Sequence, residues 1–203
     1  MAHSPNGTSA HQRGTAAETR SRLIAEAIAL FEEAGLAGFT GREVAKRAGV
    51  SHGAPRRYFP SNAALLSTVA ANGFARLNER VDAVASIERP AAEALQAVAS
   101  AYIDFAREQP NLFDLMFRHD LLEHSGESLR ENSLPLLGRL HTFANEAYPN
   151  AHPAAAVDLW LNLHGIAVLH SRNSLELVGI DAAAAVSRAI RAQLAEDSRP
   201  AED

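Results

Sequence analysis

The chain has 203 residues, of which 47% are hydrophobic, and its formal net charge is −5. This length suits one compact domain or a small head on a larger body, and the apolar fraction can supply a sizeable core. No apolar run reaches the roughly 18 residues of a transmembrane helix, and residues 1–17 lack the apolar stretch of a signal peptide, so no membrane partner is expected. There is no cysteine, which excludes disulfides and thiolate metal sites and fits an intracellular protein, expected to be cytoplasmic.

Charge is unevenly distributed along the chain. Residues 1–60 hold eight Lys and Arg and five acids, a balance of +3, whereas residues 61–203 hold eleven Arg and nineteen acids, a balance of −8. A basic head on an acidic body is expected when a phosphate-binding module is joined to a domain that does not contact DNA. A segment of this size can also reach such a balance by chance, so the charge favours nucleic acid without proving it.

Hydrophobic periodicity predicts an all-α chain of about nine helices, because apolar residues recur at helical spacing and β-branched runs are short. Residues 1–17 are polar and are expected to form a disordered tail. Pro135 lies inside one predicted helix, which is therefore expected to kink or to start later. The nine helices are expected at residues 19–34, 40–48, 51–58, 61–85, 90–108, 111–122, 128–148, 154–171 and 181–196.

Capping and turn residues set several of these boundaries. Gly35 and Gly38 are expected to end the first helix. Thr40 is a good N-cap, and Glu43 three residues later completes the spacing of a capping box. Ser51 and Ser61 are expected to cap the next two helices.

The segment from Thr40 to Phe59 has the pattern of a helix-turn-helix. It places small apolar residues where two short helices must cross, and Gly49 permits a left-handed turn between them. The second helix of such a motif lies in the major groove with its first residues towards the base edges. Its side chains would be Ser51, His52, Gly53, Pro55, Arg56 and Arg57.

Residues 22–66 resemble the DNA-binding domain of the TetR family of bacterial regulators. The matching residues are Ala27, Leu30, Phe31, Gly35, Phe39, Thr40, Val44, Ala45, Ala48, Gly49, Val50, Ser51, Gly53, Tyr58, Phe59, Leu65 and Leu66. Arg56 stands where the family usually has Tyr, and Asn62 where it usually has Lys, and both family residues typically touch DNA phosphates. The resemblance implies a DNA-binding domain at residues 18–64. The residues expected to contact DNA are Thr40, Arg42, Ser51, His52, Gly53, Pro55, Arg56, Arg57, Tyr58 and Asn62, with Arg13, Arg20 and Arg22 as further candidates.

The remainder resembles a C-terminal subgroup of that family named for a Trp, a His and a Gly, here Trp160, His164 and Gly165. Residues 102–117 also resemble that subgroup. The resemblance implies that residues 65–203 hold a ligand pocket and a dimer interface. The residues that could line an apolar pocket are Tyr102, Phe105, Phe113, Met116, Phe117, Phe143, Trp160 and His164, although each of them, taken singly, is better explained as core.

The helix expected at residues 154–171 is apolar nearly all round, so it must be buried on more than one side. One side can pack inside the subunit and the other against a partner, with the last helix completing a four-helix dimer interface. A single buried helix inside a monomer is the alternative. The residues expected at the interface are Leu159, Leu163, Ile166, His170, Val186, Ala189, Ile190 and Leu194.

A metal-dependent enzyme is the competing interpretation. His119 with Glu123 and Asp120 with His124 are i,i+4 pairs on a helix, a spacing that can bind a metal ion. A solvated helix end explains the same residues, and no serine-elbow, P-loop or zinc-protease motif occurs. An interaction domain that does not bind DNA would leave the basic head unexplained.

The sequence therefore predicts a regulator without enzymatic activity, cofactor or metal. Its expected partners are double-stranded operator DNA, a small hydrophobic effector and a second copy of the chain. By the resemblance it is a repressor on a near-palindromic operator, with half-sites about 34–36 Å apart, although the residues do not distinguish a repressor from an activator.

Overall fold

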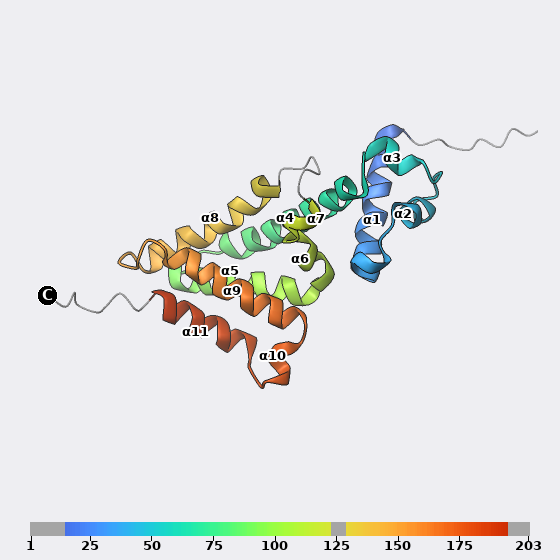
Figure 1. The fold of residues 1–203 in the computed structure, drawn as a ribbon. Coiled ribbons are helices and arrows are strands. Elements are labelled where there is room, and N and C mark those ends of the chain that lie inside the picture. Colours follow the sequence, from blue (N-terminus) through green and yellow to red (C-terminus); the bar gives the residue numbers. More distant parts are fainter. Residues whose placement is uncertain (1–14, 123–128, 195–203) are drawn as a thin grey trace, which may run out of the picture.

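The computed structural model describes residues 15–122 and 129–194, and within these residues it contains eleven helices and no strand (Figure 1). The predicted all-α class is confirmed. No helix in these ranges is both long and apolar enough to cross a membrane. The helices are α1 (Ala16–Gly38), α2 (Gly41–Arg47), α3 (Ala54–Tyr58), α4 (Asn62–Ala85), α5 (Ala91–Glu108), α6 (Pro110–Met116), α7 (His119–Leu122), α8 (Leu129–Ala147), α9 (Ala155–Ser171), α10 (Ser174–Leu177) and α11 (Ala182–Leu194).

The molecule has a small head and a larger body joined by one long helix. Helices α1, α2 and α3 gather at one end, and α4 runs from them into the body (Figure 1). Helix α4 packs on α1 in the head and on α5, α6 and α8 in the body. The predicted division between residues 64 and 65 therefore falls inside a continuous helix.

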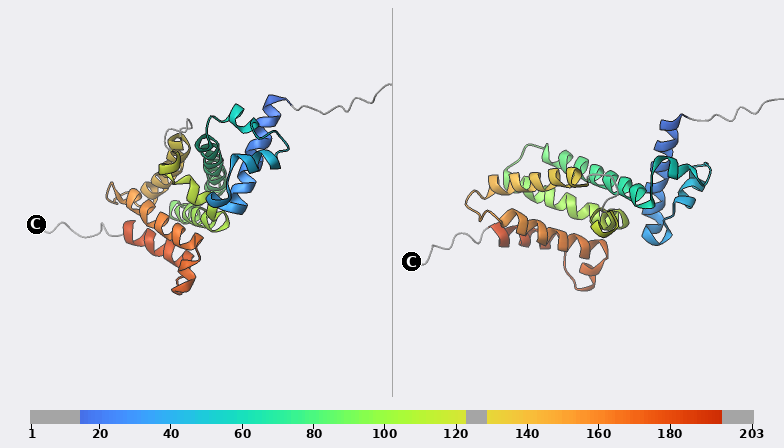
Figure 2. Two further views of the ribbon diagram at one scale, coloured as in Figure 1. Left: turned by 45° about the vertical axis from the view of Figure 1, so that its right-hand side comes forward. Right: turned by 45° about the horizontal axis from the view of Figure 1, so that its top comes forward.

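The body is a bundle whose core is continuous with that of the head. One hydrophobic cluster extends from Leu23 in α1 to Ile190 in α11. Helix α9 packs on α5, α8 and α11. Helices α9 and α11 lie side by side along one side of the body, which Figure 2 shows from two further directions.

Helix α1 begins earlier and ends later than predicted. The side chain of Thr15 accepts a hydrogen bond from the Glu18 backbone N–H (3.2 Å), and the Glu18 carboxylate accepts one from the Thr15 N–H (2.6 Å). This capping box starts the helix inside the predicted disordered tail; residues 1–14 of that tail lie outside the described residues. Gly35 does interrupt helical geometry, at φ +58°, but another turn continues to Gly38.

In the helix-turn-helix, most local predictions are confirmed. Thr40 caps α2 by accepting from the Glu43 N–H (3.2 Å), Ser61 caps α4 by accepting from the Ala64 N–H (3.0 Å), and Gly49 has φ +64°. The predicted start of the second helix is wrong.

Helix α3 begins at Ala54 rather than after Ser51, and Gly53 provides no side-chain cap. The reason is Pro55, which lacks an N–H and whose ring would clash with the carbonyl of Ser51 if the helix began there. In the first turn of a helix starting at Ala54, proline is tolerated.

About nine helices were predicted and the described residues contain eleven, for two reasons. The helix predicted over 111–122 is two helices, because Phe117 leaves helical geometry at the end of α6 (φ −107°, ψ 7°). Pro110 begins α6 instead of merely separating two helices. The four-residue helix α10 lies in a stretch for which no helix was predicted.

Candidate functional site

The turn and helix α3 present the residues predicted to meet base edges. Ser51 and His52 are exposed in the turn before α3, and Arg56 and Arg57 are exposed on α3 itself. Neither arginine pairs with a carboxylate in the described part of the chain. A Cβ added to Gly53 would meet nothing within 4 Å, so the backbone there is open to a close approach by DNA.

Three further predicted DNA contacts lie at the start of α2 and α4. Thr40, Arg42 and Asn62 are exposed. The side-chain oxygen of Asn62 lies 3.1 Å from the position of a Cβ on Gly41. The first turns of α2 and α4 are therefore adjacent, which brings these predicted residues to one region of the head.

Two predicted DNA contacts are less accessible. Pro55 is buried in the head, because the start of α3 packs inward, so its assignment to the DNA surface is corrected. Tyr58 is half-buried and packs against the core.

Several head cations are held by groups of the head itself. Arg47 donates to Glu33 (2.8 Å), which lowers the pKa of the Glu33 carboxyl, and Lys46 pairs with Glu43 (3.3 Å). The guanidinium of Arg20 lies 5.2 Å from the centre of the Phe59 ring, a cation–π arrangement. A charge balance counts all of these cations equally, so the sequence overstated the number that is free to meet phosphate.

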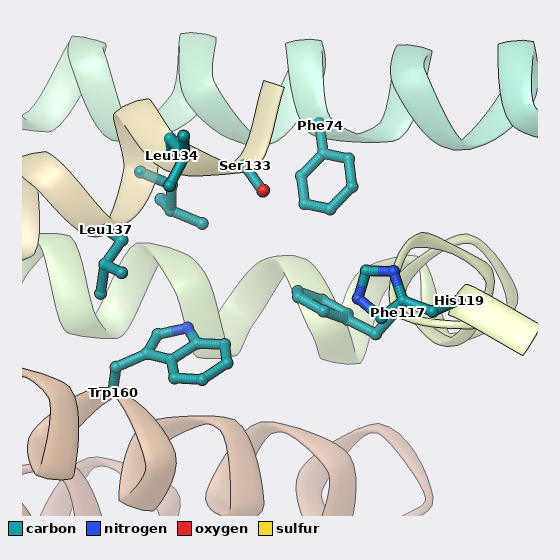
Figure 3. Close-up of a pocket in the computed structure, with 8 residues that line it drawn as sticks. Phe74, Phe117, His119, Ser133, Leu134, Leu137 and Trp160 are labelled. Carbon is teal, nitrogen blue, oxygen red and sulfur yellow. The ribbon is translucent and has the colours of Figure 1, made fainter. Parts of the chain in front are cut away.

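The body contains an apolar cavity of about 150 Å³ between α4, α7, α8 and α9 (Figure 3). Side chains from these helices point into it, and Phe74 on α4 lies on the opposite side of the space from Trp160 on α9. The lining residues are Phe74, Phe117, His119, Ser133, Leu134, Leu136, Leu137 and Trp160.

Phe117 also forms a wall of a second cavity, of about 110 Å³, which is lined by more polar residues. Arg118 and Arg172 lie there, but each pairs with an aspartate: Arg118 with Asp120 (2.8 Å) and Arg172 with Asp114 (3.4 Å). The second cavity is lined by Phe113, Asp114, Phe117, Arg118, His164, Val168, Ser171 and Arg172.

Half of the predicted pocket residues line one of these cavities: Phe113, Phe117, Trp160 and His164. Phe105 and Met116 are fully buried core, and Phe143 packs against the core outside both cavities. Tyr102 is also buried, but its hydroxyl is hydrogen-bonded to His164, which lines the second cavity. The sequence missed Phe74 and the α8 leucines, since helical periodicity does not tell which distant helices cross.

Tyr102, which is buried, forms a polar pair with His164, which is half-buried and lines the second cavity. Tyr102 Oη and His164 Nδ1 are hydrogen-bonded at 2.8 Å. The His164 ring stacks on Trp160 (centroids 5.6 Å apart) and meets Phe117 edge-on (4.5 Å). Burial lowers the pKa of His164 and raises that of Tyr102, so both groups are neutral near pH 7.

The predicted dimer residues divide into two sets. Leu159, Leu163, Val186 and Ile190 are buried within the subunit, because this face of α9 packs on α5 and α11, so no partner can reach them. Ile166, His170 and Ala189 are half-buried, and the side chain of Leu194 lies outside the described residues. The opposite face of α9 exposes three other apolar side chains: Val157, Leu161 and Leu169.

The residues of the competing metal site are only partly described. His119 is exposed at the cavity, and Asp120 is held by Arg118, which lowers the pKa of its carboxyl. Glu123 and His124 lie outside the described residues. Over residues 15–122 and 129–194, no group of three or more His, Asp or Glu side chains could hold a metal ion.

Helix α6 connects the cavities to the head. At its start, the Asn111 amide donates to the Glu32 carbonyl of α1 (3.0 Å). Arg76 of α4 pairs with the Glu32 carboxylate and also donates to Gln109 (3.1 Å). At its end, α6 leads into Phe117, which lines both cavities.

Family models match both parts of the chain. Residues 23–69 match the model described as bacterial regulatory proteins, tetR family, and residues 95–193 match a tetracyclin repressor-like C-terminal domain. The second match does not bear on the narrower Trp-His-Gly subgroup, which stays a prediction.

Solved structures share the fold over almost the whole chain. A protein of unknown function from Rhodococcus sp. RHA1 is 26% identical, with a TM-score of 0.76, over 95% of this chain and 100% of that one. A TetR transcriptional regulator from Streptomyces coelicolor is also 26% identical, with a TM-score of 0.55, over 90% and 99%.

A curated relative, the nucleoid occlusion factor SlmA of Haemophilus ducreyi, is 31% identical over 98 residues. That match covers 48% of this chain and 48% of the relative. The chain thus aligns with about half of that protein's length.

Proposed function

Since this chain belongs to the TetR family of bacterial regulatory proteins and is a transcriptional regulator with a DNA-binding helix-turn-helix, we propose that it is a ligand-responsive repressor. It binds a near-palindromic operator as a homodimer, and a small hydrophobic molecule releases it. One observation carries this proposal: α6 contacts the head at its start and leads into an apolar cavity at its end. A DNA-binding regulator of this kind would act in the cytoplasm.

Operator binding would rest on α3 and the turn before it. Arg56 and Arg57 are exposed and can neutralise phosphates, and an arginine can also read guanine through two hydrogen bonds. Gly53 leaves room for the DNA backbone. Asn62 keeps a hydrogen-bond donor but carries no charge. The arginines must therefore provide a larger share of the electrostatic attraction to the DNA phosphates.

Dimerisation would use the outer face of α9. Val157, Leu161 and Leu169 are 45%, 56% and 47% exposed and lie at spacings of one or two helical turns. The adjoining α10 and the turn after it expose Leu177 and Val178. A second copy packed on this face would cover apolar surface that is otherwise left in water.

Release would follow from a shift of α6. A molecule entering beside Phe117 displaces the end of this helix, while its start is bonded to α1 and its side packs on α4. The shift would change the spacing of the two heads in the dimer. A ligand that favours the non-binding spacing by about 1–3 kcal/mol is sufficient to change operator occupancy.

The direct test is a gel shift with DNA from upstream of the chain's own and adjacent genes. We expect a complex that weakens as salt rises, because phosphate contacts release counterions. Absence of binding to any such DNA at low salt would contradict the proposal.

The same assay with Arg56→Ala and Arg57→Ala tests the DNA surface. Each is expected to weaken binding and to lower the slope of log affinity against log salt by about 1. Arg89→Ala, in the α4–α5 connection at the far end of the body, is the matched control and should bind like the original chain. If both head variants bind the operator with unchanged affinity, α3 does not contribute to the DNA-binding surface.

A further inference from the structure

The chemistry of the larger cavity narrows the class of molecule that it accepts. We propose that the cavity between α4, α7, α8 and α9 binds a flat, uncharged aromatic compound with one ring, in preference to an anion or a flexible aliphatic chain. The inference rests on the proposed function only for the effect of that compound on DNA binding. The binding itself follows from the lining residues.

Aromatic side chains from separate segments face the space. Phe74 comes from α4, Phe117 from the end of α6, and Trp160 from α9 (Figure 3). Aromatic rings prefer offset-stacked or edge-to-face neighbours, and the rings already present adopt such arrangements, as Phe74 and Phe117 do with centroids 5.6 Å apart at 77°. A planar guest adds further contacts of the same kind.

The remaining wall and the size limit the guest. Leu134, Leu136 and Leu137 of α8 also line the cavity. Its volume of about 150 Å³ is of the order at which an apolar protein cavity holds a benzene-sized molecule. An extended acyl chain of ten carbons would have to leave the cavity or displace α8.

Among the residues that the structure describes, the cavity lining offers no fixed positive charge for an anion. His119, a titratable residue in this lining, is exposed. Arg118 lies beyond Phe117 and is bonded to Asp120 through both carboxylate oxygens (2.8 Å each). A carboxylate buried among these phenyl, indole and leucine groups would lose its hydration without gaining a partner.

The polar groups beside the cavity do not favour a charged guest. Ser133 lies on the wall (Figure 3), and its hydroxyl carries no charge. The Tyr102–His164 pair behind Trp160 is bonded within itself (2.8 Å) and adds no charge.

Trp160 provides a readout that does not involve DNA. It is the single tryptophan of the chain and it lines the cavity, so its fluorescence reports occupancy. The full chain is titrated with cinnamyl alcohol, with cinnamate, which has the same skeleton but a carboxylate, and with decanol. We expect a saturable change with cinnamyl alcohol at a concentration at least tenfold lower than with cinnamate or decanol. Equal or tighter binding of cinnamate or decanol, or no saturable change with cinnamyl alcohol, would overturn the proposal.

Two variants locate the binding. Leu137→Phe fills the cavity from α8 and should abolish the fluorescence change, whereas Leu36→Phe, an exposed site on α1, should leave it intact. Circular dichroism checks that both variants fold. If Leu137→Phe folds and binds cinnamyl alcohol as before, the compound sits elsewhere and the assignment fails.

Operator release is measured separately by gel shift. If cinnamyl alcohol changes Trp160 fluorescence but leaves the operator complex intact, the cavity assignment stands and ligand-controlled repression fails. If the operator is bound and an anionic or aliphatic compound releases it through Trp160 contact, repression stands and the ligand class fails.

Discussion

The side-chain amide of Asn111 donates a hydrogen bond to the main-chain carbonyl of Glu32, with 3.0 Å between nitrogen and oxygen. The same side chain lies 3.2 Å from the position of a Cβ on Gly35, the residue at which α1 leaves helical geometry. Gly35 has φ +58°, a conformation that side chains disfavour. The absent side chain makes room for Asn111, so the body is fastened to the head at the interruption of α1.

Loss of this bond should weaken the attachment. Asn111→Ala is expected to lower the free energy of unfolding by about 1 kcal/mol, the usual net value of a hydrogen bond. Urea denaturation measures it. Asn145→Ala, on the exposed side of α8 beside His141, should change stability by less than about 0.5 kcal/mol. Equal effects would show that the Asn111 bond does not stabilise the joint.

Gly73 marks a close approach between α4 and α6. A Cβ there would lie 2.7 Å from the Met116 sulfur and 3.0 Å from Leu112 Cγ. Gly73→Ala gains about 1 kcal/mol of helix propensity but should lose about 1–3 kcal/mol through overpacking. We therefore expect net destabilisation in urea.

The matched control is Gly138→Ala on α8, where a Cβ would meet nothing within 4 Å. This variant should be more stable by up to about 1 kcal/mol, because only the propensity changes. Stabilisation of both variants would mean that α4 and α6 are not in such close contact.

The parts of the fold that depend on local chemistry were predictable from the sequence. Thr40 and Ser61 cap helices, and Gly49 takes the left-handed conformation, because each of these depends only on neighbours in the chain. The start of α3 also depends on local chemistry: Ser51 is a good N-cap residue, but Pro55 prevents a helix from beginning directly after it. Thr15 was missed because it stands inside a polar segment.

The parts that depend on how distant helices cross were not predictable. Helix α9 is apolar on nearly every side, so its pattern cannot tell an inner leucine from an outer one. The structure buries Leu159 and Leu163, which were predicted at the interface, and exposes Leu161 and Leu169. Phe74 likewise has the sequence pattern of an ordinary core residue. Only the placement of α4 and α9 on opposite sides of one cavity shows that it lines that cavity.

The exposed face of α9 gives a test of the dimer. Leu161→Glu and Leu169→Glu place a charge on a surface that a second copy would bury, and each forfeits about 1.5–3 kcal/mol of leucine burial besides the cost of the charge. We expect monomers in light scattering at micromolar concentration. Ile87→Glu, on the α4–α5 turn and 55% exposed, should not change the oligomeric state. Dimers in both α9 variants would move the interface elsewhere.

His164 should make stability depend on pH. Burial lowers its pKa in the folded chain, while the unfolded chain takes up a proton near the ordinary value of about 6.5. Below that pH the unfolded state binds more protons, so stability is full above about pH 6.5 and falls as pH drops through the folded-state pKa. The charged groups lining its cavity, Asp114, Arg118 and Arg172, are each in an ion pair with an oppositely charged side chain.

Urea denaturation between pH 5 and 8 separates this contribution from that of the other histidines. His164→Phe removes the titrating group and should flatten the fall in unfolding free energy below about pH 6.5. Tyr102→Phe keeps His164 in place and removes its hydrogen bond of 2.8 Å. It should cost about 1–3 kcal/mol at pH 7.5 while the fall at low pH persists. If His164→Phe leaves the pH profile of the original chain unchanged, the folded protein protonates His164 as readily as the unfolded chain does.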